Sequence, residues 1–450
     1  MGRGNFMKKF LNLLVMFIVI FVTGCGSESE TLKFPEFPIA SSGIKSEKMD
    51  VDVYLDATVS MQGYTTLAAG NVYRTLPDLL YDLGSTMGEI KFYSFGAQIQ
   101  ALEGRNYRQF TTPTPYTETI TAISNVVDAA DTNHLSIIIT DLFESDADWS
   151  NVVQKIRSKF FENHLAVGVI GIKNSFSGKI FDVGLNAASF DYDSYDYPYR
   201  FRPFYILIMG NEFNVRYFME EFKERQTLPN DTEYLLLVKN LSALSNSLSD
   251  QEVLEMNNLF REDKFNLTKD GIREMGVKSF NEPSTFVLKF KRETPLGACP
   301  FEPSLKSKIK VFTQEKEAWK PLTENEFDVK IATSGEEEQE ISPDTDFYAE
   351  IKPVEDAEDT FTLKLTFTPG RFLNPDEINF VNISISPTGK SYKLPQWVAN
   401  WSMVNVDVSP NDFDGTKTVN LTRVLGSLKD SLYSAESPNL INLNFVLYER

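Results

Sequence analysis

The first half of the chain alternates between short, nearly continuous apolar runs and longer segments whose apolar residues recur every three or four positions. The runs indicate strands buried on both faces of a sheet, and the longer spacing indicates amphipathic helices. Strands are expected at Asp50–Leu55, Glu89–Ile99, Leu135–Thr140, Leu165–Ile172, Phe204–Met209 and Tyr234–Val238, and helices at Tyr73–Ser85, Thr117–Ala130, Trp149–Phe161 and Val215–Phe222. This order predicts an α/β domain over residues 49–240, with a doubly wound, mostly parallel, Rossmann-like sheet and helices on both faces.

The second half of the chain has a different pattern. One amphipathic helix is expected at Ser249–Arg261, within a helical connector over residues 241–284. From there on, short alternating runs separated by turn residues predict a β-sandwich-like module over residues 285–450. Its strands are expected at Phe286–Phe290, Ser307–Phe312, Phe327–Ile331, Phe347–Ile351, Thr360–Thr368, Asn379–Ser386 and Leu440–Tyr448, and one helix at Thr418–Tyr433. The neighbouring Trp397 and Trp401 are interpreted as packing residues rather than as a ligand platform.

The composition is that of a globular protein with more than one domain, since the 450 residues are 42% apolar and 24% charged. The net charge is -19. An acidic surface repels phosphate backbones, so we expect no nucleic-acid partner. His134 and His164, the two histidines, each come just before an apolar run, and we interpret them as residues at strand starts rather than as zinc ligands or catalytic bases.

The N-terminus has the pattern of a secretory signal over residues 1–25, with a basic stretch followed by the apolar run Leu11–Val22. The run leads into Val-Thr-Gly-Cys, which resembles a bacterial lipobox, and this resemblance implies that Cys25 is lipidated and becomes the mature N-terminus. The alternative is an uncleaved transmembrane anchor, but this needs roughly 20 apolar residues, and the run Leu11–Val22 is shorter. Residues 26–48 are expected to be a flexible tether. We therefore expect a lipid-anchored, extracytoplasmic protein, at the cell surface or on the periplasmic face of a membrane.

Polar residues follow the first expected strand at every second position. Asp56, Thr58 and Ser60 offer one carboxylate and two hydroxyls on a loop. This all-oxygen set suits a hard divalent cation such as Mg2+ rather than zinc or copper. Asp141 directly follows the buried run Leu135–Thr140. Ligands of open α/β sheets bind beyond the carboxyl ends of the strands, which is where both aspartates are expected.

These residues carry a resemblance to the von Willebrand factor A domain, over about residues 49–225. That family has a metal-ion-dependent adhesion site with the pattern Asp-x-Ser-x-Ser after the first strand. A threonine follows in a second loop, and an aspartate, usually followed by glycine, comes after the fourth strand. Asp56-Ala-Thr58-Val-Ser60 is similar to the first loop, with threonine in place of the first serine. Asp141 is similar to the last aspartate, with Leu142 in place of the glycine.

The middle threonine of the family pattern is assigned to Thr117, with Thr119 and Thr114 as alternatives. The resemblance implies that this threonine and the two hydroxyls of the first loop place oxygens on a Mg2+, Mn2+ or Ca2+ ion, which the two aspartates hold directly or through water. It also implies an open coordination position that the Asp or Glu carboxylate of a protein partner fills. The resemblance therefore favours a binding protein over an enzyme.

Two alternatives remain open at this stage. In the first, the domain is a metal-free scaffold of the envelope, and Asp56 and Ser60 only cap a helix. In the second, the loop Asp56-Ala-Thr58 resembles the nucleophile loop of a haloacid-dehalogenase-like, Mg2+-dependent phosphatase, with Asp146 and Asp148 as its acidic pair. That family also needs a lysine downstream, and no lysine of this chain has a clear place at a strand end or helix start.

Tyrosines and aspartates alternate in the segment Phe190–Arg202. In a strand, this alternation places the rings on one face and the acids on the other. Tyr192, Tyr195 and Tyr197 are candidates for partner binding, because tyrosine supplies a large contact area at low entropy cost. The alternative is a hairpin that packs its rings on the surface of its own domain.

Overall fold

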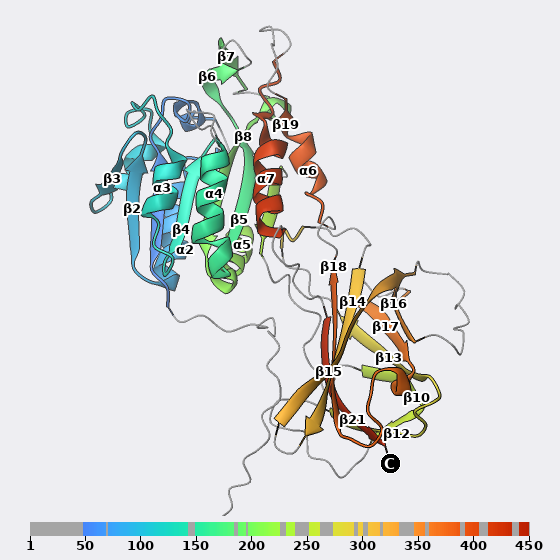
Figure 1. Cartoon of the computed structure of the whole chain (residues 1–450). Helices are drawn as coiled ribbons and strands as arrows, with labels where there is room; N and C mark the ends of the chain where they lie inside the picture. Colours follow the sequence, from blue (N-terminus) through green and yellow to red (C-terminus); the bar gives the residue numbers. More distant parts are fainter. Residues whose placement is uncertain are drawn as a thin grey trace, which may run out of the picture.

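The computed structural model describes residues 48–68, 71–142, 149–183, 188–194, 197–225, 231–238, 252–261, 273–291, 296–299, 305–315, 318–332, 346–355, 360–387, 392–404, 413–433 and 441–449. The expected signal segment with Cys25, and the expected tether up to residue 47, lie outside the described residues. Most of the buried apolar side chains fall into two clusters, one around each of two large sheets. Figure 1 shows the two sheets and the helices that accompany the first.

The first sheet has seven strands in the order β3-β2-β1-β4-β8-β5-β9. Its strands are β1 (Val51–Asp56), β2 (Ile90–Phe95), β3 (Ile99–Leu102), β4 (Leu135–Thr140), β5 (Ala166–Asn174), β8 (Arg202–Gly210) and β9 (Thr232–Leu237). All residues of β1 and β4 are buried, as their apolar runs predict.

The expectation of a mostly parallel sheet is wrong, because the sheet is mixed. β1 is parallel to β2 and to β4, whereas β8 lies between β4 and β5 and is antiparallel to both. The reason lies in the connection from β5 to β8, which is the hairpin β6 (Ser177–Val183) and β7 (Ala188–Asp193) instead of a helix. Without a crossover helix the chain stays at the end of β5 and has to run back antiparallel.

Helices cover both faces of the first sheet (Figure 1). One face carries α2 (Leu76–Met87) and α5 (Glu212–Arg225), and the other carries α3 (Ile123–Ala129), α4 (Trp149–Lys159) and α7 (Leu421–Tyr433). The predicted helices in this part of the chain are confirmed, although the one expected from Thr117 begins only at Ile123. Apolar residues at every third or fourth position of each helix explain this arrangement, since each helix buries one face on the sheet.

Two helices from the C-terminal part of the chain belong to the first core. The short α6 (Gln396–Asn400) and α7 pack with the buried side chains of the first sheet. The Trp397 indole nitrogen donates a hydrogen bond to the Tyr234 carbonyl at 3.1 Å, and the Tyr433 hydroxyl donates one to the Val238 carbonyl at 3.3 Å. The contacts therefore do not follow the expected boundary at residue 285, because an amphipathic pattern predicts a helix but not the surface on which it packs.

The second sheet has ten strands in the order β10-β13-β17-β16-β15-β14-β18-β21-β12-β11. They are β10 (Glu252–Asn257), β11 (Leu259–Arg261), β12 (Arg273–Val277), β13 (Ser284–Lys291), β14 (Leu305–Glu315), β15 (Ala318–Ile331), β16 (Phe347–Pro353), β17 (Thr360–Phe367), β18 (Asn379–Pro387) and β21 (Ile441–Glu449). Neighbouring strands are antiparallel except in the pairs β15–β16 and β12–β21.

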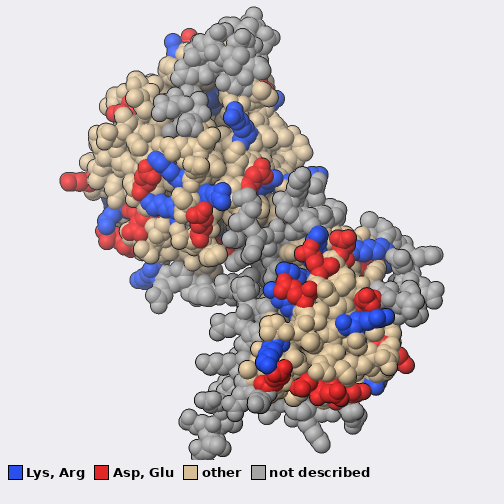
Figure 2. Space-filling model, in the orientation of Figure 1, with Lys and Arg blue, Asp and Glu red and all other residues tan. Residues whose placement is uncertain are grey.

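The expected β-sandwich is wrong, because these strands form one continuous sheet that curls into a half-barrel around its own core (Figure 1). Alternating apolar positions are the same in one curled sheet and in two facing sheets, so the sequence pattern does not distinguish them. On the outer face, Lys308 of β14 pairs with Glu324 of β15 at 2.7 Å, and basic and acidic side chains lie next to one another on the face shown in Figure 2.

The expected helix Ser249–Arg261 is also wrong, since its described residues form strands β10 and β11. Asn258 joins the two strands with φ at 57°, the left-handed conformation that asparagine tolerates better than most residues. Its side-chain amide donates to the carbonyls of Ser279 and Glu282. These contacts with a distant turn, and the pairing with β13, override the local helical pattern.

Among the described residues, no helix is long and apolar enough to cross a membrane.

Candidate metal centre

The candidate site begins at Asp56, the last residue of β1, whose side chain is completely buried. Its carboxylate oxygen Oδ1 accepts hydrogen bonds from the backbone N–H of Thr58 at 3.0 Å and from the Thr58 hydroxyl at 2.6 Å. The loop that follows is fixed by the backbone, because the Ala57 N–H donates to the Phe95 carbonyl and the Val59 N–H to the Glu118 carbonyl. The side chain and its loop therefore have a defined geometry at the carboxyl end of the strand.

The two hydroxyls of the first loop lie next to this carboxylate. The Thr58 and Ser60 hydroxyl oxygens are 3.0 Å apart. Since the Thr58 hydroxyl donates to Asp56, it accepts from Ser60, and the three side chains form one chain of hydrogen bonds. The helix-capping alternative finds no support here, because the short helix η1 (Gln62–Thr65) that follows has no side-chain cap.

The second half of the site comes from the end of β4, which pairs directly with β1. The Thr140 hydroxyl donates to the other carboxylate oxygen of Asp56, Oδ2, at 2.8 Å across a sequence separation of 84 positions. Asp141 follows, is buried, and acts electrostatically on Asp56. The structure therefore brings Asp56, Thr58, Ser60 and Asp141 together at one edge of the sheet, as predicted from their positions after buried strands.

Thr140 also belongs to this cluster, although the sequence pattern predicted no role for it. A threonine in a buried apolar run is a common strand residue, and its position alone does not show which way the hydroxyl points. The available signal was its place as the last residue of β4, next to Asp141, at the edge where polar groups gather. Its hydroxyl also accepts a hydrogen bond from the Leu142 N–H at 3.2 Å, so it links Asp56 to the turn after β4.

Leu142 has an unusual backbone conformation. Its φ is 60°, in the left-handed region, and its side chain is buried. A leucine rarely adopts this conformation, whereas glycine does so without strain. The turn after β4 therefore contains a leucine where its backbone conformation would suit a glycine.

The electrostatics of the cluster favour a bound cation. The pKa of Asp56 is raised to about 7, first by burial and next by the negative charge of Asp141, against the lowering effect of the hydrogen bonds from Thr58 and Thr140. Two acids buried near one another oppose each other's ionisation. A divalent ion between them would favour the charged form of both.

The side chains present fit such an ion by their chemistry. Carboxylate and hydroxyl oxygens are the ligands that Mg2+, Mn2+ and Ca2+ accept. Within the described residues, no group of three or more His, Cys, Asp or Glu side chains is placed to hold a metal ion. Any cation at this edge therefore depends on the hydroxyls of Thr58 and Ser60 together with the two aspartates.

The expected middle threonine, Thr117, lies on the loop beside the site but has an exposed side chain. Its neighbour Glu118 forms a bridge with Thr58, so this loop runs directly along the first one. The alternatives Thr114 and Thr119 are exposed as well. Thr121 of the same loop is buried, although the sequence pattern predicted no role for it.

Aromatic side chains form the wall behind the cluster. Tyr64 is fully buried, packs edge-on against Phe176 with ring centroids 4.9 Å apart, and donates its hydroxyl to the Pro203 carbonyl at 2.6 Å. The Tyr73 and Tyr116 hydroxyls are 2.9 Å apart, and burial raises the pKa of both. This wall excludes water from one side of the site, and charges interact more strongly in such surroundings.

The tyrosine-rich segment divides into a packed part and an exposed part. Tyr192 of β7 packs under the Arg200 guanidinium and donates its hydroxyl to the Arg200 carbonyl, as the self-packing alternative predicts. Tyr197 and Tyr199 are 50% and 77% exposed, with ring centroids 5.8 Å apart. Tyr195 lies outside the described residues. The hairpin β6–β7 also packs against η1, which places this segment beside the candidate site.

Comparisons with known proteins add no family. A scan against protein-family models gave no match, and neither did a search of the curated proteins. Among the solved structures, the chain is similar to the crystal structure of a strand-swapped CTLA-4 from the duckbill platypus, with 12% identity over 25% of this chain and 71% of that chain. The TM-score of 0.12 is too low to carry any argument about fold or function.

Proposed function

We propose that the protein is a lipid-anchored, extracytoplasmic binding protein whose first domain holds a protein partner through a divalent cation. One observation carries the proposal. Asp56 and Asp141, from adjacent strand ends, are buried together with the Thr58 and Ser60 hydroxyls, although burial and mutual repulsion disfavour the charged carboxylates. A cation removes this repulsion, and the hydroxyls complete a hard oxygen donor set.

Each side chain has a distinct role in this proposal. Asp56 and Asp141 supply negative charge, while Thr58 and Ser60 add neutral oxygens that keep the total charge low. Thr140 positions Asp56 through its hydrogen bond to Oδ2. The bound ion supplies a positive centre with a position left for one further ligand. Because only two of the four side chains are charged, the site with its ion carries no excess negative charge that would repel an outside carboxylate.

The surroundings of the site support a protein as the source of that carboxylate. Several of the exposed large apolar side chains of the first domain lie on loops at this edge of the sheet, namely Leu67, Ile120, Tyr197 and Tyr199. Apolar and aromatic side chains around a polar centre are typical of protein–protein interfaces. We therefore expect the partner to present an Asp or Glu side chain with apolar residues around it.

The direct test is calorimetry of the full chain with Mg2+ and Mn2+. The expected result is saturable binding of one ion that Asp56→Asn abolishes. Asp52→Asn is the matched control, because Asp52 is a buried carboxylate of the same strand outside the candidate site. The absence of binding in the unaltered chain would leave the metal-free scaffold as the better explanation. Turnover of a generic phosphate ester, lost in Asp56→Asn, would favour the phosphatase, whose acidic pair Asp146 and Asp148 lies outside the described residues.

A second experiment tests the partner chemistry. A library of short peptides is selected on the chain in the presence of Mg2+, and bound peptides are released with EDTA. The expected result is enrichment of peptides with an Asp or Glu next to apolar residues. Enrichment that is the same for the Asp56→Asn variant would contradict a cation-mediated contact, because binding would then not pass through the site.

A further inference from the structure

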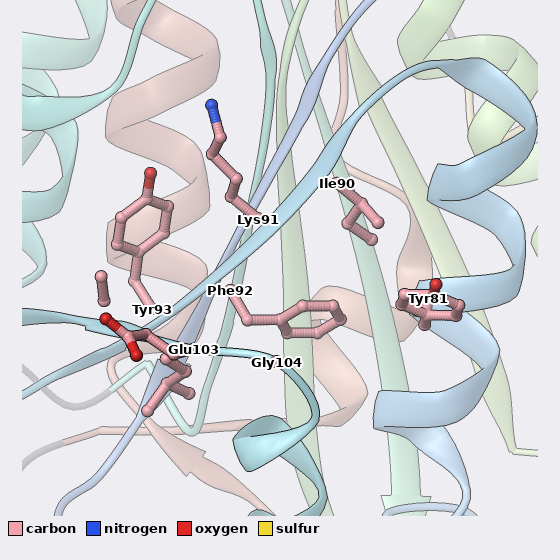
Figure 3. A pocket seen from close by; sticks show the side chains of 9 residues that line it. Tyr81, Ile90, Lys91, Phe92, Tyr93, Glu103 and Gly104 are labelled. Carbon is pink, nitrogen blue, oxygen red and sulfur yellow. The ribbon is translucent and has the colours of Figure 1, made fainter.

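A pocket lies at the opposite end of the first sheet, where β2 begins. It has a volume of about 310 Å3 and is lined among others by Tyr81, Ile90, Lys91, Phe92, Tyr93 and Glu103 (Figure 3). Tyr81 comes from α2 and the next four residues from β2, and Glu103 directly follows β3. The candidate metal centre lies at the carboxyl end of β1, whereas the pocket lies at the amino end of the parallel strand β2. The two features therefore lie at opposite ends of these strands.

The pocket lies where the edge of the sheet is incompletely covered. β3 pairs with β2 only from Phe92 to Phe95. Ile90 and Lys91, the first residues of β2, have a neighbouring strand on the β1 side alone within the described part of the chain. An edge with unpaired backbone groups is a template for an added extended segment.

The pocket has three aromatic lining residues, with Tyr81 and Phe92 on one face of the sheet and Tyr93 on the other. Tyr107 is stacked between Tyr81 and Phe92, with ring centroids 5.7 Å and 4.2 Å away. Tyr93 is stacked on Tyr54 at 5.0 Å. These contacts fix the rings in place before any ligand arrives. Fixed aromatic side chains are typical contacts of proline-rich extended segments, whose low flexibility reduces the entropy cost of binding.

The chain itself contains a segment with matching chemistry. Residues 33–38 read Lys-Phe-Pro-Glu-Phe-Pro, two repeats of a charged residue followed by phenylalanine and proline. In a polyproline II helix, with three residues per turn, such a repeat puts Phe34 and Phe37 on one line and Lys33 and Glu36 on another. The pocket offers the complementary charges Lys91 and Glu103, of which Lys91 also forms an exposed ion pair with Glu89 at 3.5 Å.

The segment also comes from the correct side of the domain. The described chain starts at Lys48, and the Met49 N–H donates to the Met87 carbonyl just before β2 begins. From Ile39 to Lys48 the chain spans at most roughly 30 Å. The pocket is only about two strand spacings, on the order of 10 Å, from the start of β1. The connecting residues are therefore long enough to reach it.

We propose that the pocket at the start of β2 binds the repeat Lys33–Pro38 of the same chain. The two phenylalanines contact the aromatic lining, and the two charges pair with Lys91 and Glu103. The bound repeat lies along the uncovered start of β2 in the polyproline II conformation, without strand pairing. Because the repeat precedes the first domain, this contact fastens the N-terminal part of the chain to the edge opposite the candidate metal centre and leaves that centre directed away from the N-terminal anchor.

Photo-crosslinking of the full chain tests this proposal. Phe37 is replaced by p-benzoylphenylalanine, and crosslinked peptides are identified by mass spectrometry. The expected result is a crosslink within one chain to the region 81–104, at a yield that does not depend on protein concentration. Crosslinks that join two chains would show a second copy as the source of the segment and would overturn the proposal, as would crosslinks to other regions or none.

Variants of the pocket separate binding from proximity. Tyr81→Ala is expected to lower the crosslink yield by about tenfold, because it removes an aromatic contact of the pocket. Tyr217→Ala is the matched control, since Tyr217 is an equally exposed tyrosine on α5 and is not part of the lining. An equal loss in both variants, or no loss in either, would overturn the proposal. A synthetic peptide of residues 31–40 should compete with the crosslink for the same reason, and failure to compete would count against it.

Discussion

Each end of strand β1 has a buried carboxylate, and the two carboxylates have partners of opposite kinds. At the first end, Asp52 lies 2.8 Å from the His134 ring nitrogen Nδ1. At the other end, Asp56 lies beside Asp141 and receives only hydrogen bonds from hydroxyls and one backbone N–H. The same residue type in the same strand is thus paired with a basic ring in one case and with a second acid in the other.

This difference distinguishes two roles of a buried carboxylate, stabilising the fold and binding a ligand. An acid with an imidazole partner is satisfied within the fold, and it fastens the start of β1 to the start of β4. An acid next to another acid either takes up a proton, as the raised pKa of Asp56 indicates, or stays charged beside a cation from outside. The end with Asp56 is therefore the one that we assign to a ligand, and the end with His134 the one that we assign to stability.

The largest expected difference between the two ends is in cation binding. Asp56→Asn should weaken Mn2+ binding by about 100-fold or more, because it removes a charged ligand while keeping the size of the side chain. Asp52→Asn should leave the affinity almost unchanged. Calorimetry of both variants measures the contrast, and an equal effect of the two substitutions would remove the distinction between the ends.

The next effect concerns stability at the His134 end. His134→Ala leaves Asp52 buried without its partner and should cost about 2 kcal/mol of the free energy of unfolding at about pH 5.5. The hydrogen bond to Asp52 raises the pKa of His134 above its ordinary value of 6.5. The folded state therefore holds the proton more tightly than the unfolded chain, and the stability that this adds is complete below 6.5 and lost as the pH rises through the raised pKa.

Urea unfolding at several pH values checks this expectation. Tryptophan fluorescence is a suitable signal, since Trp397 and Trp401 are buried in the first core. The unaltered chain should lose more stability than His134→Ala between about pH 5.5 and about pH 9. Parallel curves for the two proteins would mean that the imidazole contributes no pH-dependent stability.

A smaller effect is expected from Thr140, which contacts Asp56 without being assigned as a metal ligand. Thr140→Val keeps the shape of the side chain and removes the hydrogen bond to Oδ2. Loss of an outer contact of this kind should weaken cation binding by about tenfold. Ser136→Val is a useful control on the same strand, because the Ser136 hydroxyl is buried without a hydrogen-bond partner in the described structure. An unchanged affinity in Thr140→Val would show that Asp56 does not need this contact.

The smallest effect concerns the backbone at Leu142. Replacement by Gly or Ala removes the same packing, but only Gly relieves the left-handed conformation. Leu142→Gly should therefore be more stable than Leu142→Ala by about 1 kcal/mol. At Ile139 in β4 the order should be reversed, because glycine weakens an ordinary strand. Urea unfolding of the four variants measures both differences, and the same order at both positions would contradict the strain at Leu142.

The sequence predicted the parts of the first domain that local patterns control. Buried strands reveal themselves as apolar runs, and a polar residue directly after such a run marks the sheet edge. This is why the proximity of Asp56 and Asp141 could be inferred before the structure was known. Thr140 and Thr121 were missed because a pattern of residue types does not show which hydroxyls point inward.

The remaining differences from the expectations arise from contacts between distant residues. The place of β8 between β4 and β5 depends on a hairpin that keeps the chain at one edge. The strands at Glu252–Arg261 depend on Asn258 and on pairing with β13. The packing of α7 depends on a surface formed by the first sheet. Each of these three features depends on contacts with residues far along the chain, and the local spacing of apolar residues does not predict such contacts.

The return of α6 and α7 to the first core has a consequence for biosynthesis. A ribosome delivers β1 to β9 first and then the strands β10 to β18, and only afterwards the helix that completes the first core. The second sheet in turn receives β21, which lies between β18 and β12, as its last strand. Neither core can close before almost the whole polypeptide has emerged. We therefore expect truncated translation products to remain unfolded, and the chain to mature in one late, cooperative event.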